Sequence, residues 1–347
     1  MSSSCPAYLS DAKTLIDVIE FRRRHNPDKI YFTLYHEEKS VTFAELGRQV
    51  DQYAWNFRQR GLKKGDRMVI MLPTCKEFFF AFFGAQRIGV IPAPIFPNSP
   101  PPRVAGIVKD SGAAAIFGTT WMFGETIKAA IEDVPGIQVI DVAEMESVEI
   151  PEGYDFGDVE LDGDHLAFLQ YTSGSTGASK GVMLSHKNLL TNVRAIVERV
   201  QLSPDDVGVS WLPLYHDMGL IGFVMSTLYC AVRLILLPPD LRNIRTWLEA
   251  VTRYKGNFIA APDFGFRLCN RNIDDTEGLD LSSVRAAYSG AEPIRAATIR
   301  AFQQKFNVGN IFVPAYGLAE TSVCATAMYI NRDIIEDENG FICVGPP

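Results

Sequence analysis

A glycine- and hydroxyl-rich loop with one lysine, residues 172–181 (TSGSTGASKG), is the segment of this sequence best suited to chemistry. Its three glycines allow backbone amides to turn toward an anion, its hydroxyl groups can donate hydrogen bonds, and Lys180 adds positive charge. A Walker A loop opens directly onto a helix, whereas here a short apolar strand, 182–184, follows Lys180. A hairpin that binds no ligand is the alternative. The order of ten residues around an embedded lysine favours a polyphosphate site.

Three further segments combine polar side chains with apolar or glycine-rich surroundings: WLPLYHDMGLIG (211–222), SGAEP (289–293) and PAYGLAE (314–320). His216 and Asp217 lie between an expected strand and an expected helix. There an imidazole could contact an anionic substrate, or could be a satisfied histidine at a helix start. A single tyrosine is often filler and a single glutamate often a solvated charge, but the joint spacing of Tyr316 and Glu320 in one motif favours function. His186, at the start of a helix, is interpreted as structural.

Short apolar strands alternate with longer helical segments on both sides of the loop. We expect strands at 67–72, 114–117, 138–140, 167–171, 182–184 and 209–212, and helices at 76–87, 103–110, 121–131 and 218–229, with a further helix capped by Ser185. The proline-rich stretch 91–102 is expected to be a stiff connector. This alternation predicts βαβ units around a mostly parallel sheet, so the fold class is α/β. We expect two subdomains, 1–160 and 161–347, with an acidic surface loop at 150–164.

Composition excludes several classes of protein. The 33 Lys and Arg against 41 Asp and Glu give a formal net charge of −8, which argues against nucleic acid as a partner. The six cysteines are scattered without metal-ligand spacing, as in a cytoplasmic protein with reduced thiols, and residues 1–11 lack the layout of a signal peptide. The apolar stretch 218–239 contains Arg233 and predicts a buried helix and strand rather than an integral membrane protein.

The segment YTSGSTGASKG (171–181) resembles the phosphate-binding signature of the adenylate-forming enzymes, the superfamily of acyl-CoA synthetases, nonribosomal adenylation domains and luciferases. The other three motifs follow in the order of that family, and the resemblance extends from about Phe32 onward. It implies the family's large N-terminal domain, with stacked βαβ subdomains. It also implies attack of a carboxylate on the α-phosphorus of ATP, which gives an acyl-adenylate and pyrophosphate before the acyl group passes to a thiol.

The resemblance implies a role for each matched residue. The β- and γ-phosphates would be held by Thr172, Ser173, Gly174, Ser175, Thr176, Gly177 and Lys180, and the adenine would be enclosed by Gly290, Ala291, Glu292, Ala315, Tyr316, Gly317 and Leu318. Within the second set, Tyr316 would stack on the base. Glu320 would bind Mg²⁺, a hard cation suited to carboxylate and phosphate oxygens. The expected catalytic residues are His216, Lys180 and Glu320.

Two features resemble the fatty acyl-AMP ligases, which transfer the acyl group to the phosphopantetheine thiol of an acyl carrier protein rather than to CoA. They are the sequence LPLYHDMGLIG and Ala319, which stands where most acyl-CoA synthetases carry threonine. The fatty acid would then occupy an acyl tunnel lined by Met218, Gly219, Ile221, Met225, Phe264 and Phe266.

Two alternatives remain at this stage. The stretch 321–344 is short for the extra segment of the fatty acyl-AMP ligases, which keeps a long-chain acyl-CoA synthetase open. The family's ribose-binding aspartate and catalytic lysine belong to later motifs that are not found here. We therefore expect that the sequence stops before the end of the N-terminal domain and lacks the C-terminal domain, and that residues 1–347 alone could be a nucleotide or acyl-adenylate binding module with little turnover.

Overall fold

The computed structural model describes residues 9, 11–132, 134, 136–146, 149–172 and 179–347. The chain forms two compact units. Unit 1 contains Met1–Ser10, Lys29–Val41 and Thr191–Pro347, and unit 2 contains Asp11–Asp28 and Thr42–Leu190. These bounds differ from the two continuous subdomains expected from the sequence, because the chain passes between the units more than once.

Unit 2 is built around a four-stranded parallel sheet with the strand order β4-β3-β5-β6. Its strands are β3 (Arg67–Met71), β4 (Ile91–Pro94), β5 (Ala115–Gly118) and β6 (Gln138–Asp141), and its helices are α1 (Leu15–His25), α2 (Phe43–Gln59), α3 (Lys76–Arg87), α4 (Pro101–Ser111), α5 (Thr120–Ile131) and the short 3-10 helix η2 (Val142–Glu146). The strands and helices expected between residues 67 and 140 are therefore confirmed, with small shifts of their ends.

The proline-rich stretch 91–102 is not a connector throughout, so that expectation is wrong for its first residues. Ile91–Pro94 form the buried strand β4, which pairs in parallel with β3. Strand β4 lies at the edge of the sheet, where the missing N–H of a proline need not interrupt a ladder of hydrogen bonds. Pro101 and Pro102 then occupy the first turn of α4, whose N–H groups would lack a helical partner in any case.

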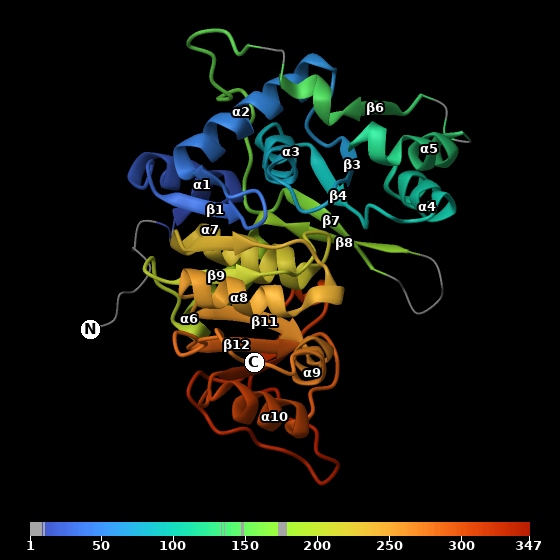
Figure 1. Ribbon diagram of the computed structural model, residues 1–347. Helices are drawn as coiled ribbons and strands as arrows, with labels where there is room; N and C mark the ends of the chain where they lie inside the picture. The colour runs from blue at the N-terminus through green and yellow to red at the C-terminus, as the bar shows by residue number, and fades with distance from the viewer. Residues whose placement is uncertain (1–8, 10, 133, 135, 147–148, 173–178) are drawn as a thin grey trace. The chain divides into compact units, whose positions relative to one another are not determined.

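Apolar side chains of the sheet and of two helices form a core cluster in unit 2. Figure 1 shows α4 and α5 side by side, and both contribute to this cluster. Val69, Ile107, Ile116 and Ile127 are typical members, each at most 2% exposed. Helix α3 is buried from Phe78 to Gln86 and packs on α2. Burial of this much apolar surface is the main force that holds the unit together.

Unit 1 is built around an eight-stranded sheet with the order β14-β13-β12-β11-β9-β10-β1-β2. Its strands are β1 (Ile30–Leu34), β2 (Lys39–Thr42), β9 (Val207–Ser210), β10 (Arg233–Leu236), β11 (Phe258–Pro262), β12 (Ala286–Gly290), β13 (Phe312–Tyr316) and β14 (Thr326–Ala327). Its helices are the latter part of α6 (His186–Val200), the π-helix η3 (Met218–Met225), α7 (Ser226–Cys230), η4 (Leu241–Asn243), α8 (Arg245–Tyr254), α9 (Asp263–Asn272), α10 (Ala296–Phe306) and η5 (Ala319–Thr321). The pairs from β13 to β1 are parallel, which confirms the α/β class and places six carboxyl ends at one edge.

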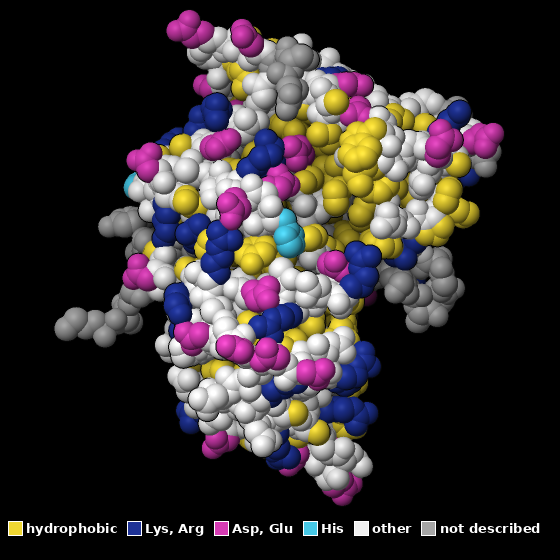
Figure 2. All heavy atoms as spheres, in the orientation of Figure 1, with side chains coloured by type: hydrophobic (Ala, Val, Ile, Leu, Met, Phe, Trp, Pro, Cys, Tyr) yellow, Lys and Arg dark blue, Asp and Glu magenta, His cyan; other side chains and the backbone are white. Residues whose placement is uncertain are grey.

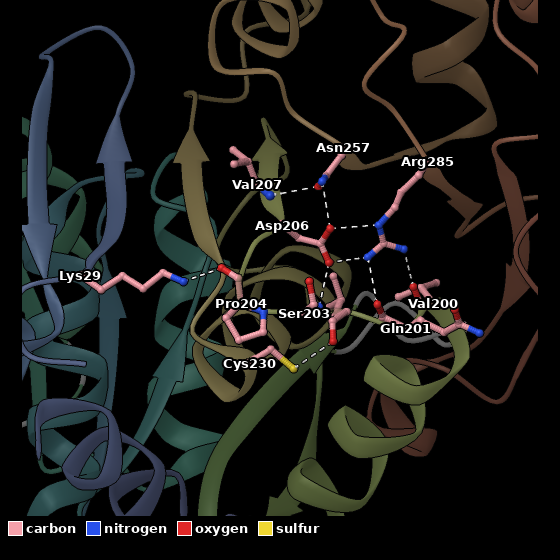
Figure 3. Close-up of polar contacts among 11 residues, drawn as sticks. Lys29, Val200, Gln201, Ser203, Pro204, Asp206, Val207, Cys230, Asn257 and Arg285 are labelled. Carbon is pink, nitrogen blue, oxygen red and sulfur yellow. Dashed lines mark hydrogen bonds and ion pairs between the residues drawn. The ribbon is translucent and has the colours of Figure 1, made fainter. Parts of the chain in front are cut away.

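A polar network fixes the opposite, amino-terminal edge of this sheet (Figure 3). Asp206, Asn257 and Arg285 directly precede β9, β11 and β12. The Asp206 carboxylate accepts hydrogen bonds from Asn257 Nδ2 at 2.9 Å and from Arg285 Nε at 2.9 Å. It also accepts one from the backbone N–H of Ser203 at 2.8 Å, and Asp206 is only 5% exposed. The network therefore ties three neighbouring strands together at the edge away from their carboxyl ends.

Part of the surface of unit 2 is apolar. Figure 2 shows hydrophobic side chains gathered over the region of β3 and β4. Large exposed hydrophobic side chains of this unit include Phe96 after β4 and Trp121 and Met122 in α5, which are 40%, 82% and 48% exposed. Within the part of the chain that is described, no helix is both long enough and apolar enough to cross a membrane.

Candidate functional site

In unit 2, an antiparallel ribbon holds the two ends of the predicted phosphate loop. Its strands are β7 (Leu166–Thr172) and β8 (Lys180–Ser185), as expected, and Thr172 is the cross-strand partner of Lys180. Lys180 is exposed, so its ammonium group is accessible to an anion. Ser173, Gly174, Ser175, Thr176 and Gly177 lie outside the described residues. After β8, Ser185 Oγ accepts a hydrogen bond from Asn188 N at 3.2 Å, which confirms Ser185 as the cap of α6.

Side-chain contacts hold the base of this ribbon in place. Tyr171 Oη donates a hydrogen bond to Asp110 Oδ2 of α4 at 2.6 Å, and burial together with this carboxylate raises the pKa of Tyr171. The Tyr171 ring lies directly over its cross-strand partner Gly181, where a Cβ would come within 2.9 Å of the ring. A glycine is therefore required at 181 by packing, and the loop begins and ends on a fixed support.

In unit 1, the two predicted nucleotide motifs meet at the carboxyl ends of neighbouring strands. Gly290 ends β12, Tyr316 ends β13, and the two strands are parallel partners. A Cβ on Gly290 would lie 2.9 Å from the Ala315 carbonyl oxygen, so the two backbones approach closely. Ala291 follows with φ of 65°, a left-handed conformation that costs about 1–2 kcal/mol for a residue with a Cβ. Such strain at a strand end is typical of functional sites.

Two carboxylates anchor the loop that carries this strain. Glu292 Oε1 accepts a hydrogen bond from the backbone N–H of Phe264 at 2.5 Å, at the start of α9. The buried Asp263 accepts one from the backbone N–H of Arg295 at 3.1 Å, and its other oxygen accepts one from Thr298 Oγ1 at 3.2 Å. The Glu292 side chain is thus a helix cap in this structure, a role that the sequence did not reveal.

The second motif presents an exposed ring and an exposed carboxylate. Tyr316 is 54% exposed, and Leu318 is 36% exposed. Gly317 lies so close to the following turn that a Cβ would be 1.6 Å from the Val323 carbonyl oxygen. Glu320 is exposed on the short helix η5. The arrangement offers a flat aromatic face for stacking and, four residues later, an acidic oxygen ligand.

Sequence reasoning missed one polar group at this edge. The Ser289 hydroxyl, next to Gly290, is buried and has no hydrogen-bond partner among the described residues. A buried hydroxyl without a partner costs free energy, so it indicates a water or ligand contact. The sequence signal that could have identified Ser289 is its position as the first residue of the SGAEP motif.

For Mg²⁺, the described residues contain no group of three or more His, Cys, Asp or Glu side chains that could hold a metal ion by themselves. Mg²⁺ is commonly bound by one or two carboxylates with the substrate phosphates completing its octahedron. One exposed carboxylate, Glu320, therefore fits a magnesium ion that arrives with a nucleotide.

His216 and Asp217 lie at the start of the helix η3, as the sequence predicts. Their side chains are paired, with 2.9 Å between His216 Nδ1 and Asp217 Oδ1. Asp217 Oδ1 also accepts a hydrogen bond from the backbone N–H of Met218 at 2.6 Å. Burial lowers the pKa of His216, but the hydrogen bond and charge of Asp217 outweigh it, so the pKa is raised above its ordinary value.

The residues predicted for an acyl tunnel have different environments. Gly219, Ile221, Met225 and Phe266 are buried, and Met218 and Phe264 are half-buried. The Phe266 ring packs against Phe302 and Phe312, with centroids 5.2 and 4.9 Å away, so it belongs to a closed aromatic core. Phe264 instead faces Trp211, with 6.2 Å between ring centroids.

A small pocket in unit 1 was not predicted from the sequence. It has a volume of about 80 Å³ and is lined by His36, Trp211, Leu237, Pro238, Asp240, Asn243, Ile244, Thr246 and Trp247. Several of these residues directly follow β1, β9 and β10. Ligands of open α/β sheets bind outside the carboxyl ends of the strands. The position of these residues after strands is therefore the sequence feature that could have indicated a pocket.

These features define an α/β protein whose candidate site lies at the carboxyl ends of parallel strands, and comparison with known proteins gives its family. Residues 19–347 match the AMP-binding enzyme family. The chain belongs to this family, which confirms the resemblance found in its motifs.

Two of the curated proteins that the chain resembles are fatty acid ligases. The chain is 30% identical over 329 residues to JamA, a medium-chain fatty acid–acyl carrier protein ligase of Moorena producens, covering 89% of this chain and 55% of JamA. It is 35% identical over 285 residues to FadD26, a long-chain fatty acid–AMP ligase of Mycobacterium marinum, covering 76% of this chain and 48% of FadD26. The chain thus spans about half the length of these curated relatives.

Solved structures agree on the fold. A fatty acyl-adenylate ligase of Legionella pneumophila, solved with acyl adenylate and pyrophosphate, superposes with a TM-score of 0.85 at 29% identity. The match covers 99% of this chain and 63% of that protein. The mixed α/β fold with mostly parallel sheets is therefore that of an adenylate-forming N-terminal domain.

Proposed function

We propose that this chain carries the ATP- and acyl-binding part of an enzyme that converts a fatty acid and ATP into an acyl-adenylate and pyrophosphate. The observation that carries the proposal is the convergence of SGAEP and PAYGLAE at the carboxyl ends of β12 and β13. The names of the relatives support fatty acids as the substrate class.

Charge is the main obstacle in this reaction, because a carboxylate must attack a phosphate that is also anionic. The enzyme must neutralise both groups and align the attack. We assign the phosphates to Thr172, Lys180 and the residues between them, and Mg²⁺ to Glu320. When bound, Mg²⁺ would offset phosphate charge, and the exposed ammonium group of Lys180 would do the same from the protein.

The adenine is assigned to the surface after β12 and β13. The exposed Tyr316 ring offers a stacking face, and the backbones of Gly290 and Ala315 approach closely at the same strand ends. Ala291, Gly317 and Leu318 complete the assigned surface. Glu292 is assigned an anchoring role, because its carboxylate is engaged with Phe264 N.

The fatty acid is assigned to apolar side chains near the carboxyl ends of β9 and β11. The rings of Trp211 and Phe264 pack edge to face there, and Trp211 also lines the small pocket with Trp247. The Trp211 indole N–H has no partner among the described residues, so it remains a donor for a polar atom of the substrate. Met218, Gly219, Ile221 and Met225 would contact the acyl chain only if η3 moves, since most of them are buried.

The acceptor of the acyl group is proposed to be the phosphopantetheine thiol of an acyl carrier protein. Ala319 within GLAE and the similarity to JamA, an acyl carrier protein ligase, support this choice. Enzyme, ATP and a fatty acid supplied together with holo carrier protein and CoA should give acyl-carrier protein as the main product. If acyl-CoA is the main product, the acceptor is CoA and the enzyme is an acyl-CoA synthetase.

Fatty-acid-dependent exchange of pyrophosphate into ATP tests the adenylation step. Tyr316→Ala should weaken nucleotide binding about tenfold, since loss of one base–aromatic stack costs roughly 1–3 kcal/mol. Tyr329→Ala is the matched control, because Tyr329 is similarly exposed at 51%. Glu320→Gln should raise the Mg²⁺ concentration needed for half-maximal exchange, whereas Glu338→Gln should not. Equal effects of the test and control variants would refute the assignment.

A further inference from the structure

The pairing of His216 with Asp217 selects one nitrogen of the imidazole for external contacts. Nδ1 lies 2.9 Å from Asp217 Oδ1 and 3.3 Å from the backbone nitrogen of Met218, so in the imidazolium form, where Nδ1 carries a proton, it donates that proton's hydrogen bond to the carboxylate. The opposite nitrogen, Nε2, is then the one that can reach another molecule. The His216 side chain is 51% exposed and that of Asp217 is 15% exposed, so the carboxylate is the inner partner of the pair.

The backbone fixes this pair at a helix start. The His216 carbonyl oxygen accepts a hydrogen bond from Leu220 N at 2.9 Å, in the first turn of η3. Gly219 packs against the preceding loop, where a Cβ would lie 2.3 Å from the Pro213 carbonyl oxygen. The Cα atoms of the pair are therefore held by both the helix and the loop.

We propose that Asp217 is a positioning residue for the adenylation reaction, which orients the His216 ring so that Nε2–H donates a hydrogen bond to an anionic oxygen of the substrate carboxylate or of the α-phosphate. The inference rests on the proposed function. In this proposal Asp217 does not contact the substrate, because its carboxylate is engaged with His216 and with Met218 N.

The electrostatics support this role. Among the described residues, Asp217 is the charged group that acts on the His216 ring, and it raises the pKa of His216 against the opposing effect of burial. A raised pKa keeps the imidazolium form at higher pH and releases the proton only as the pH rises through that value. An imidazolium with both nitrogens protonated can donate to Asp217 and to an anion at the same time.

Asp217 could instead serve only as a cap for η3, because it accepts a hydrogen bond from Met218 N. Asp217→Asn separates these roles. The asparagine side-chain oxygen can still accept from Met218 N, but the charge that favours imidazolium is gone. Asp205→Asn is the matched control, since Asp205 is exposed and precedes a different element.

The first measurement is an NMR titration of the histidine side chains, which needs no activity. The chain has five histidines, and His216→Gln identifies the resonance of His216. Asp217→Asn should lower the pKa of His216, because the opposite charge that favours the imidazolium is removed. Asp205→Asn should leave it unchanged. An unchanged pKa of His216 in Asp217→Asn would overturn the pairing.

The second measurement is the pH profile of pyrophosphate exchange. Exchange should fall as the pH rises through the pKa of His216, and in Asp217→Asn this fall should begin at a lower pH. A merely structural role would reduce exchange equally at every pH. A shifted NMR titration with an unshifted exchange profile would overturn the role in catalysis. Absence of exchange in the unmodified enzyme would instead count against the proposed function, and the NMR result would still decide the pairing.

Discussion

Replacing Asp206 should destabilise unit 1 more than any exposed acidic substitution nearby. The Asp206 carboxylate is 5% exposed and accepts hydrogen bonds from Ser203 N, Asn257 Nδ2 and the Arg285 guanidinium (Figure 3). Asp206→Ala removes all of these acceptors and leaves the guanidinium without its counter-charge. Breaking a buried ion pair from one side typically costs about 3–5 kcal/mol.

The magnitude expected here is the lower end of that range. Arg285 would keep two other acceptors, the carbonyl oxygens of Val200 at 2.6 Å and Gln201 at 3.1 Å. Its side chain is 30% exposed, so water can solvate part of the abandoned charge. We therefore expect Asp206→Ala to lower the free energy of unfolding by about 3 kcal/mol.

Urea unfolding followed by tryptophan fluorescence can report on unit 1 separately. Trp211 and Trp247 belong to unit 1, whereas Trp55 and Trp121 belong to unit 2 and can be replaced by phenylalanine. Asp205→Ala, which removes the same charge at the neighbouring exposed position, should change the free energy of unfolding by about 0.5 kcal/mol or less. Equal losses for the two variants would refute the argument.

The remaining predictions concern packing, strain and pH. Gly317→Ala should abolish nucleotide binding measured by calorimetry, because its Cβ would overlap the Val323 carbonyl oxygen at 1.6 Å. Ala291→Gly should raise the free energy of unfolding by about 1 kcal/mol by relieving a left-handed φ, as a higher urea midpoint would show. Burial lowers the pKa of His186 to about 4, and its Nδ1 accepts a hydrogen bond from Leu15 N. Its folded pKa lies below the unfolded value of about 6.5, so stability should be full above that pH and be lost as the pH falls toward 4, a slope that His186→Gln should flatten in urea titrations.

Much of the local structure could be predicted from the sequence because it depends on local patterns. Helix α3 (Lys76–Arg87) contains the apolar run 78–85 and follows a strand, and the sequence predicts both of its ends at the observed residues. Strand β4 could not be recognised, because its two prolines are unfavourable in strands except at a sheet edge, and edge position depends on the whole topology. The sequence predicts a helix from residue 218 but not the π-helical form of η3 (Met218–Met225) or the close approach of Gly219 to the Pro213 carbonyl oxygen.

In the candidate site, too, the residues of one short motif could be predicted from the sequence, whereas contacts between distant segments could not. Tyr316 and Glu320 were predicted because a short motif contains both, and the structure leaves both exposed. The pocket beside Trp211 and Trp247 was missed although several of its residues follow strands, because its residues come from segments that are far apart in the sequence and meet only through the strand order. The anchoring role of Glu292 was hidden for the same reason, because its partner, Phe264, is 28 residues away.

The two edges of the sheet in unit 1 have opposite effects on the stability of the fold. At the amino-terminal edge, Asp206 and Arg285 satisfy each other and the surrounding backbone, which stabilises the fold. At the carboxyl edge, Ala291 is held in a left-handed conformation and the Ser289 hydroxyl is buried without a partner among the described residues, which both cost stability. Strain of this kind persists only where the surrounding structure is stable enough to hold it. Substitutions at the amino edge should therefore lower stability with little effect on nucleotide affinity, and relief of strain at Ala291 should raise stability while weakening that affinity.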